Sequence, residues 1–254
     1  MEWTEVFKEA NIVGFLLLFF RFASLFLAVP IFSHKNIPMN IKASMAFFFA
    51  IVFYSSMPEI TFEVNFPNVL LATLSEFLFG LSIGMVLLLS YNVITFAGGI
   101  ISFMMGFSMA SAIDPQSGIS MPIISQFLSL MALMVLFSLD LHHWMLLYIE
   151  SSLSTIPLGG FLMKEDLFDY IIYAASRMFM VGFMIAFPIV ALSWLADVIF
   201  GMLMKTMPQF NLLVIGFPIK IMVSFGVLIA TFTATMLIVK TEMLEAFNAL
   251  EMFF

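Results

Sequence analysis

The segment FLFGLSIGMVLLLSYNVITFAGGIISFMMGFSMASAI, residues 77–113, carries no charged side chain. Glycines interrupt it at Gly80, Gly84, Gly98, Gly99 and Gly106. As one helix rising about 1.5 Å per residue it would be about 55 Å long, whereas the hydrocarbon core of a bilayer is about 30 Å thick. We therefore predict a helix that ends near Ala97, followed by an apolar segment, Gly98–Gly118, that turns or unwinds at membrane depth. Lipid does not tolerate unpaired backbone groups, so this second part must lie within protein or line a water-filled cavity, as in a conduit or an assembly interface.

The composition is that of an integral membrane protein. Of the 254 residues, 63% are hydrophobic and 10% are charged, and the mean hydropathy is +1.14, whereas soluble domains carry about 25% charged residues. The N-terminal sequence MEWTEVFKEAN lacks the cationic region of a cleaved signal peptide, so we expect the first apolar segment to be retained. The absence of cysteine excludes disulfides and thiolate metal sites. The net charge of −7 comes without a basic patch, which argues against a nucleic-acid partner.

Hydropathy predicts an all-α membrane protein of one domain, residues 1–254, with about six apolar helical segments. These segments are Ile12 to Phe32, Ile41 to Met57, Val69 to Ala97, Ile123 to Leu139, Tyr170 to Val198 and Leu212 to Val239. Prolines lie in apolar surroundings at Pro30, Pro122, Pro188 and Pro218. Because proline removes a helical hydrogen bond, we expect several of the helices to be kinked or broken. Broken helices suit both a transporter and a subunit that fits against others.

Four charged residues lie within or at the ends of apolar segments: Arg21, Glu76, Arg177 and Lys220. A charge at the bilayer centre costs about 2.5 to 3.5 kcal/mol on insertion scales, so each needs a partner or water. We favour structural pairing, within the chain or with neighbouring subunits, over an ion or proton pathway. A small-solute transporter with discontinuous helices remains the alternative function.

The sequence gives little sign of metal binding, cofactor binding or catalysis. His142 and His143 are adjacent, and neighbouring side chains on a helix point about 100° apart, so we expect no shared metal ion. No cofactor is expected, and no motif of a hydrolase, a nucleotide-binding loop or an intramembrane protease occurs, so we expect no enzyme. Met104, Met105 and Met109 cluster in the glycine-rich segment. They either fill gaps in a core or line a surface that deforms and reseals.

The motifs together resemble the family of flagellar biosynthetic FliR proteins, the T-type subunits of the type III secretion export apparatus, over essentially the whole chain. The features that carry the resemblance are Arg21 with Pro30-Ile31-Phe32; Glu76 followed by Gly80 and Gly84; Gly106-Phe107-Ser108-Met109-Ala110 leading to Asp114-Pro115; His142; Pro157-Leu158-Gly159-Gly160; and Met207-Pro208-Gln209-Phe210-Asn211 running into Val214-Ile215-Gly216-Phe217-Pro218. One departure is Leu141, where relatives more often have glycine. It puts in doubt a tight backbone approach at that turn.

The resemblance implies a core component of a protein-conducting gate in the bacterial cytoplasmic (inner) membrane, within the flagellar basal body. P-type and Q-type subunits would complete a helical, pseudo-hexameric complex, the autocleaved B-type switch subunit would be a further partner, and unfolded flagellar proteins would be its substrates. Much of this complex would be raised towards the periplasm, so that helices pack on neighbouring subunits rather than on lipid.

The resemblance also implies that the segment from Met104 to about Gly118 is a plug that occludes the closed channel. Its residues are Met104, Met105, Gly106, Phe107, Ser108, Met109, Ala110, Asp114 and Pro115. Glycine permits close packing and unusual backbone angles, and we expect Asp114-Pro115 to end the helix that precedes it. Pro208, Gln209 and Asn211 would mark a second connection.

Overall fold

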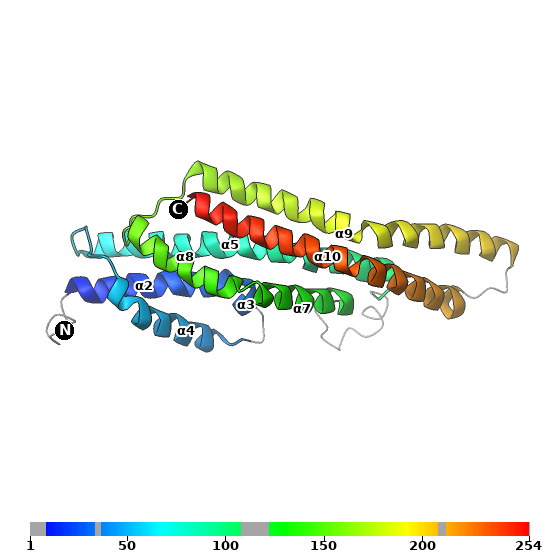
Figure 1. Cartoon of the computed structure of the whole chain (residues 1–254), viewed down its shortest axis with the longest axis horizontal. Coiled ribbons are helices and arrows are strands. Elements are labelled where there is room, and N and C mark those ends of the chain that lie inside the picture. The colour runs from blue at the N-terminus through cyan, green and yellow to red at the C-terminus, as the bar shows by residue number, and fades with distance from the viewer. Residues whose placement is uncertain (1–8, 34–36, 108–121, 208–211, 254) are drawn as a thin grey trace. The chain divides into compact units, whose positions relative to one another are not determined.

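The computed structural model describes residues 9–33, 37–107, 122–207 and 212–253, and these form helices joined by turns, with no strand among them. The elements are α2 (Glu9–Ala28), α3 (Pro30–Ser33), α4 (Met39–Val52) with the 3₁₀ turn η1 (Phe53–Ser56), α5 (Phe66–Met105), α7 (Ile123–Ser138), α8 (Leu141–Thr155), α9 (Glu165–Thr206), the π-helical turn η3 (Leu212–Gly216) and α10 (Phe217–Phe253) (Figure 1). Within these described ranges, five helical segments are long and apolar enough to cross a membrane, and the bent pair α7 and α8 could provide a sixth. The predicted class, an all-α membrane protein with about six apolar segments, is confirmed.

Helix α5 corrects the first prediction. It runs for 40 residues from Phe66 to Met105, so the chain stays helical through Gly98 and Gly99 instead of unwinding there. A glycine in a helix interior costs only about 1 kcal/mol relative to alanine. Gly98 also has a packing role, because a Cβ added to it would lie 2.5 Å from the Cα of Ser125 in α7. The glycine pair is therefore compatible with an unbroken helix, and Gly98 serves the close approach of a second one.

Three of the four prolines lie at or next to the start of a helix, and Pro30 and Pro218 divide the apolar segments that contain them into separate helical elements. Pro30 is the first residue of α3, Pro122 directly precedes α7, and Pro218 is the second residue of α10. The first turn of a helix tolerates proline because its backbone N–H would have no helical partner there. Pro188 alone lies inside a helix, α9.

Helix α8 lies in a stretch that the hydropathy analysis left unassigned, after the fourth predicted segment, Ile123 to Leu139. It follows α7 after the two-residue turn Leu139-Asp140. Its buried face is narrow and contains Leu141, Met145, Ile149 and Leu153. The intervening histidines and serines lower its hydropathy below that of a membrane span, which is why the sequence analysis missed it.

The described helices divide into two compact units, comprising residues 1–89, 137–174 and 244–254 in the first and residues 90–136 and 175–243 in the second. The prediction of a single domain is not tested by this division and stays a prediction. In the first unit α2 and α4 lie side by side (Figure 1). Phe22 of α2 stacks on Phe49 of α4, with ring centroids 5.8 Å apart, and Phe26 lies 5.5 Å from Phe49.

The contact between α2 and α5 depends on small residues. Gly80 and Gly84 are four positions apart on α5, the spacing that lets membrane helices approach closely. A Cβ on Gly80 would collide with the Ser24 hydroxyl and the Arg21 carbonyl of α2, and one on Gly84 would lie 2.5 Å from the Ala28 Cβ. The two helices therefore touch along their backbones, with Ser24 and Ala28 of α2 facing the two glycines.

Alanine at Gly80 should destabilise the protein by about 2–3 kcal/mol, because the obstructing atoms include rigid backbone. Gly99→Ala is the matched control on the same helix, since nothing lies within 4 Å of a Cβ there, and it should stabilise by about 0.5–1 kcal/mol. Apparent melting temperatures of the two purified variants in detergent should move in opposite directions. Equal effects of the two substitutions would contradict the close packing described for α2 and α5.

Candidate functional site

A buried ion pair joins α2 to α5 at the level of the small-residue contact. Arg21 and Glu76 are both fully buried. The guanidinium donates Nε–H to Oε2 of Glu76 and Nη2–H to Oε1 at 3.0 Å, so the pair is bidentate, the geometry in which arginine binds carboxylates best. The guanidinium carbon also lies 4.5 Å from the centre of the Phe79 ring, which adds a cation–π contact.

The remaining hydrogen bonds of this pair come from the end of α8 and the turn that follows it. Arg21 Nη1 donates to the Ser152 hydroxyl at 3.0 Å, and the backbone N–H of Gly159 donates to Glu76 Oε1 at 2.7 Å. Both charges are thus paired and further hydrogen-bonded, the condition under which a buried ion pair is tolerated. Residues from three distant parts of the sequence thus form one buried hydrogen-bond network whose two charges cancel.

The Gly159 donor is positioned by a tight turn. Gly160 N–H donates to the Pro157 carbonyl at 2.9 Å, and Gly159 has a φ of +76°. These values fit a type II turn, in which the third residue needs a positive φ and is therefore usually glycine. A Cβ on Gly159 would also lie 2.6 Å from the Cβ of Ala72. The motif Pro157-Leu158-Gly159-Gly160 therefore serves the same ion pair as Arg21 and Glu76.

Two further ion pairs lie in the second unit. Arg177 of α9 binds Glu242 of α10 through Nε and Nη2, each at 2.8 Å. Lys220 of α10 binds both carboxylate oxygens of Asp197 of α9, at 2.8 and 2.9 Å. All four charged residues singled out from the sequence thus have partners within the chain.

Sequence analysis missed those two partners. Asp197 lies in the run PIVALSWLADVIF and Glu242 lies just after the last apolar segment, so the signal was present in their positions. The two pairs differ in burial: the side chain of Glu242 is 9% exposed and that of Asp197 is 57% exposed. The Asp197 carboxylate therefore remains open to solvent, lipid headgroups or another chain.

Helix α5 ends at Gly106 in a Schellman motif. Gly106 has a φ of +90°, its N–H donates to the Phe103 carbonyl at 3.0 Å, and the Phe107 N–H donates to the Ser102 carbonyl at 3.1 Å. This pair of bonds and the left-handed glycine define the motif. Helix α5 therefore ends before Gly106. Asp114 and Pro115, which we expect to end the helix that precedes them, lie outside the described residues, so that expectation stays a prediction.

The end of α5 is held by its neighbours in the second unit. Met105 is fully buried, and the Met104 carbonyl accepts a hydrogen bond from Ser193 of α9 at 3.3 Å. The Phe107 ring meets Phe225 of α10 edge-on at 6.3 Å. The first four residues of the predicted plug are thus a helix end and a turn, whereas Ser108, Met109, Ala110, Asp114 and Pro115 lie outside the described residues.

The chain re-enters the described structure at Pro122, and α7 is fixed to α5 by polar contacts. The Ser125 hydroxyl donates to the Thr95 carbonyl at 2.8 Å, Thr95 and Ser129 share a hydrogen bond of 2.9 Å, and Tyr91 donates to the Ser129 carbonyl at 2.9 Å. Both ends of the segment 108–121 are therefore attached to fixed helices.

The other motif residues lie at helix ends. Gly216 closes η3 and is buried, and Pro218 lies in the first turn of α10. Pro208, Gln209 and Asn211 fall outside the described residues. Leu141, the departure from the family pattern, is the first residue of α8 and is 3% exposed, so it packs as a core side chain. The group best suited to a metal ion among the described residues is Asp140, His142 and His143.

Long apolar helices, with buried charges that pair with one another, are typical of a polytopic membrane protein in which charged residues stabilise helix packing. We identify no catalytic site among the described residues. The chain belongs to the bacterial export proteins, family 1, whose model matches residues 12–246. This places it among bacterial export proteins and confirms the resemblance drawn from the motifs.

Individual relatives agree with the family match. The chain is 35% identical to the flagellar biosynthetic protein FliR of Bacillus subtilis (strain 168), over 89% of each chain. It is 27% identical to the FliR of Escherichia coli (strain K12), over 83% of this chain and 80% of that protein. Similarity to the FliR of Aquifex aeolicus is lower, at 23% identity, but covers 98% of this chain and 96% of that protein.

Neutralising one member of the buried pair, as in Arg21→Met or Glu76→Met, should destabilise the protein by about 3–5 kcal/mol, because the other charge is left buried without its counter-charge. The double variant Arg21→Met/Glu76→Met should cost clearly less than the sum of the two single changes. The measurement is a double-mutant cycle on thermal unfolding in detergent. Additive costs would show that the two residues act independently.

Proposed function

We propose that the chain is a core subunit of the flagellar type III protein export gate. With P-type and Q-type subunits it forms the channel through which unfolded flagellar proteins cross the cytoplasmic membrane, in the basal body, and the autocleaved B-type switch subunit contacts this assembly. The observation that carries the proposal is the match to the export-protein family over residues 12–246. The flagellar part is supported by relatives that bear the name flagellar biosynthetic protein FliR.

Helix lengths support a role within an assembly. Helices α5, α9 and α10 contain 40, 42 and 37 residues. At about 1.5 Å per residue each is about 55–65 Å long, about twice the thickness of a bilayer core. Helices of this length leave apolar surface outside the lipid unless other protein covers it. Partner subunits of the P and Q types would provide that cover.

Helix α9 presents an apolar stripe suited to such a partner. Its members follow the spacing i, i+1, i+4, i+5, i+8 and so share one helix face. They are Phe179, Met180, Phe183, Met184 and Phe187, all exposed. Methionine and phenylalanine adapt to irregular apolar surfaces, which favours subunit contact.

The gate itself is proposed to be the segment that begins at Met104 and extends to about Gly118. Its support is the Schellman motif at Gly106, which turns the chain sharply away from the axis of α5. Because α5 and α7 hold the two ends, the length of the segment limits the volume that it can fill. Met109 and its neighbours would then close a lumen formed with partner subunits.

We propose no catalytic or solute-coupling role. The buried charges of Arg21 and Glu76 are paired with each other, and both side chains accept or donate further local hydrogen bonds. A proton or ion pathway needs a buried group that can change its charge and its partner during the cycle. This closed network favours a structural role over that of a secondary transporter.

Removing the gene should abolish secretion of flagellar proteins and swimming, and a copy carrying the control change Gly99→Ala should restore both. The measurement is the amount of flagellar protein in the culture medium, together with motility in soft agar. Secretion that continues without the gene would overturn the proposed function.

Deleting Ala110–Asp114 should leave the gate assembled but make the membrane leak ions, because the shortened segment cannot fill the lumen. The matched control keeps the length and composition of residues 110–114 and changes only their order, and it should remain tight. Ion leakage is measured in cells that overproduce the complete gate, after the complex has been shown to assemble. A tight membrane in the deletion variant would count against the plug assignment.

A further inference from the structure

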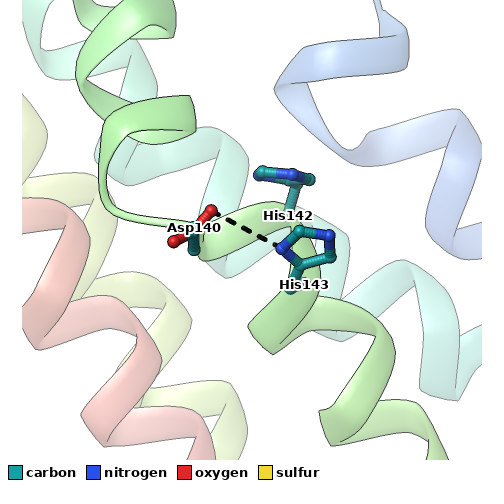
Figure 2. A group of neighbouring side chains, drawn as sticks. All are labelled: Asp140, His142 and His143. Carbon is teal, nitrogen blue, oxygen red and sulfur yellow. Dashed lines mark ion pairs between the residues drawn. The ribbon is translucent and has the colours of Figure 1, made fainter.

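Three potential metal ligands converge at the start of α8. Figure 2 shows Asp140, His142 and His143 grouped at the turn between α7 and α8, with an ion pair drawn between Asp140 and His143. Oδ1 of Asp140 lies 3.5 Å from Nδ1 of His143, and the two imidazole rings have centroids 4.1 Å apart. One ligand atom from each residue can be chosen so that all three lie within 4.8 Å of one another.

The backbone at Asp140 explains how its carboxylate comes close to the two histidines, which the sequence analysis did not expect to share a metal ion. Asp140 has a φ of +54°, and its carbonyl accepts hydrogen bonds from the N–H groups of His143 and Trp144, at 2.9 and 3.2 Å. The chain thus turns sharply just before the first helical residue. The carboxylate comes to lie beside His143, and the two imidazole rings lie close together with 36° between their planes.

Asp140 and His142 have potential ligand atoms that form no other hydrogen bond within the part of the chain that the structure describes. The Asp140 side chain makes no capping hydrogen bond to α8, and its 3.5 Å distance to His143 exceeds that of a hydrogen bond. Nδ1 of His142 is buried without a hydrogen-bond partner among the described residues. The His142 ring is meanwhile held edge-on against Phe137, with centroids 5.1 Å apart. A buried imidazole nitrogen without a hydrogen-bond partner, next to two other side chains that can ligate a metal, is the observation that points to a bound ion.

We propose that Asp140, His142 and His143 bind one divalent transition-metal ion of the zinc class. Imidazole nitrogen and carboxylate oxygen are ligands that Zn²⁺ and Co²⁺ accept, whereas Mg²⁺ and Ca²⁺ prefer oxygen alone. The carboxylate supplies one negative charge against the metal's two. Three protein ligands leave the fourth tetrahedral position for a water molecule.

The geometry needs only small side-chain movements. Neighbouring nitrogen ligands on tetrahedral zinc lie about 3.3 Å apart, given bonds of about 2.0 Å. The side chains of Asp140 and His143 are 69% and 66% exposed, so both can rotate towards His142 without disturbing the core. A bound ion would fix the turn ahead of Leu141, the buried residue that begins α8. We assign the bound ion no role beyond fixing this turn, and the site does not depend on the proposed export function.

The test is a metal titration of the purified full-length chain carrying a tag without histidine. The sequence has three histidines and no cysteine, so His34 is the one histidine outside the cluster and its change to glutamine is the matched control. Co²⁺ is followed by its visible absorption and Zn²⁺ by competition with a chromophoric chelator. We expect one ion per chain, with His34→Gln unchanged and His143→Gln weakened at least about tenfold.

His143 is the first choice for substitution because it is exposed, so a loss of binding reflects the lost ligand and not a lost fold. Asp140→Asn should also weaken binding, to a smaller extent, because an amide oxygen is a poorer ligand than a carboxylate. Circular dichroism and gel filtration should show both variants folded like the parent. The proposal is overturned if the parent binds no Co²⁺ at concentrations below about 100 µM, because protein metal sites ordinarily bind far more tightly than that. It is also overturned if His143→Gln binds Co²⁺ as tightly as the parent.

Discussion

The packing of the first unit depends on a buried ion pair, in which each charge needs the other. Arg21 and Glu76 are removed from water completely, and either one without the other would cost several kcal/mol. Their side chains can meet because Gly80 lets α2 and α5 touch along their backbones. Gly159 then completes the coordination of the carboxylate through a turn that glycine alone adopts easily. A single electrostatic requirement thus fixes the α2–α5 contact and the turn after α8.

The sequence predicted the features that depend on local composition, and it missed those that depend on distant neighbours. Long apolar runs identified most of the helices, and the cost of isolated charges singled out Arg21 and Glu76 as residues in need of partners. Nothing local says that Arg177 would choose Glu242, because that pairing depends on how α9 and α10 pack. The prediction for Gly98 was wrong for the same reason. In the sequence, a glycine that breaks a helix cannot be distinguished from one that allows a second helix to pack closely, and only the position of Ser125 in the structure separates the two.

The family match and the geometry support the same kind of molecule from independent directions. Helices about twice as long as a bilayer core is thick fit the proposed packing against partner subunits, and α9 carries an exposed stripe of phenylalanine and methionine. The ion pairs join helices within the chain, and the exposed apolar faces are the surfaces that we propose for contact with other subunits. The Schellman turn at Gly106 starts the proposed plug from a fixed point within that framework.

Affinity purification of the chain from membranes that also contain the P-type and Q-type subunits tests the proposed role as a gate subunit. The account predicts that the three proteins elute together in detergent as one stable complex of constant stoichiometry, and that the isolated chain does not transport small solutes in liposomes. A chain that elutes alone while both other subunits are present, and that moves a solute when reconstituted by itself, would contradict it.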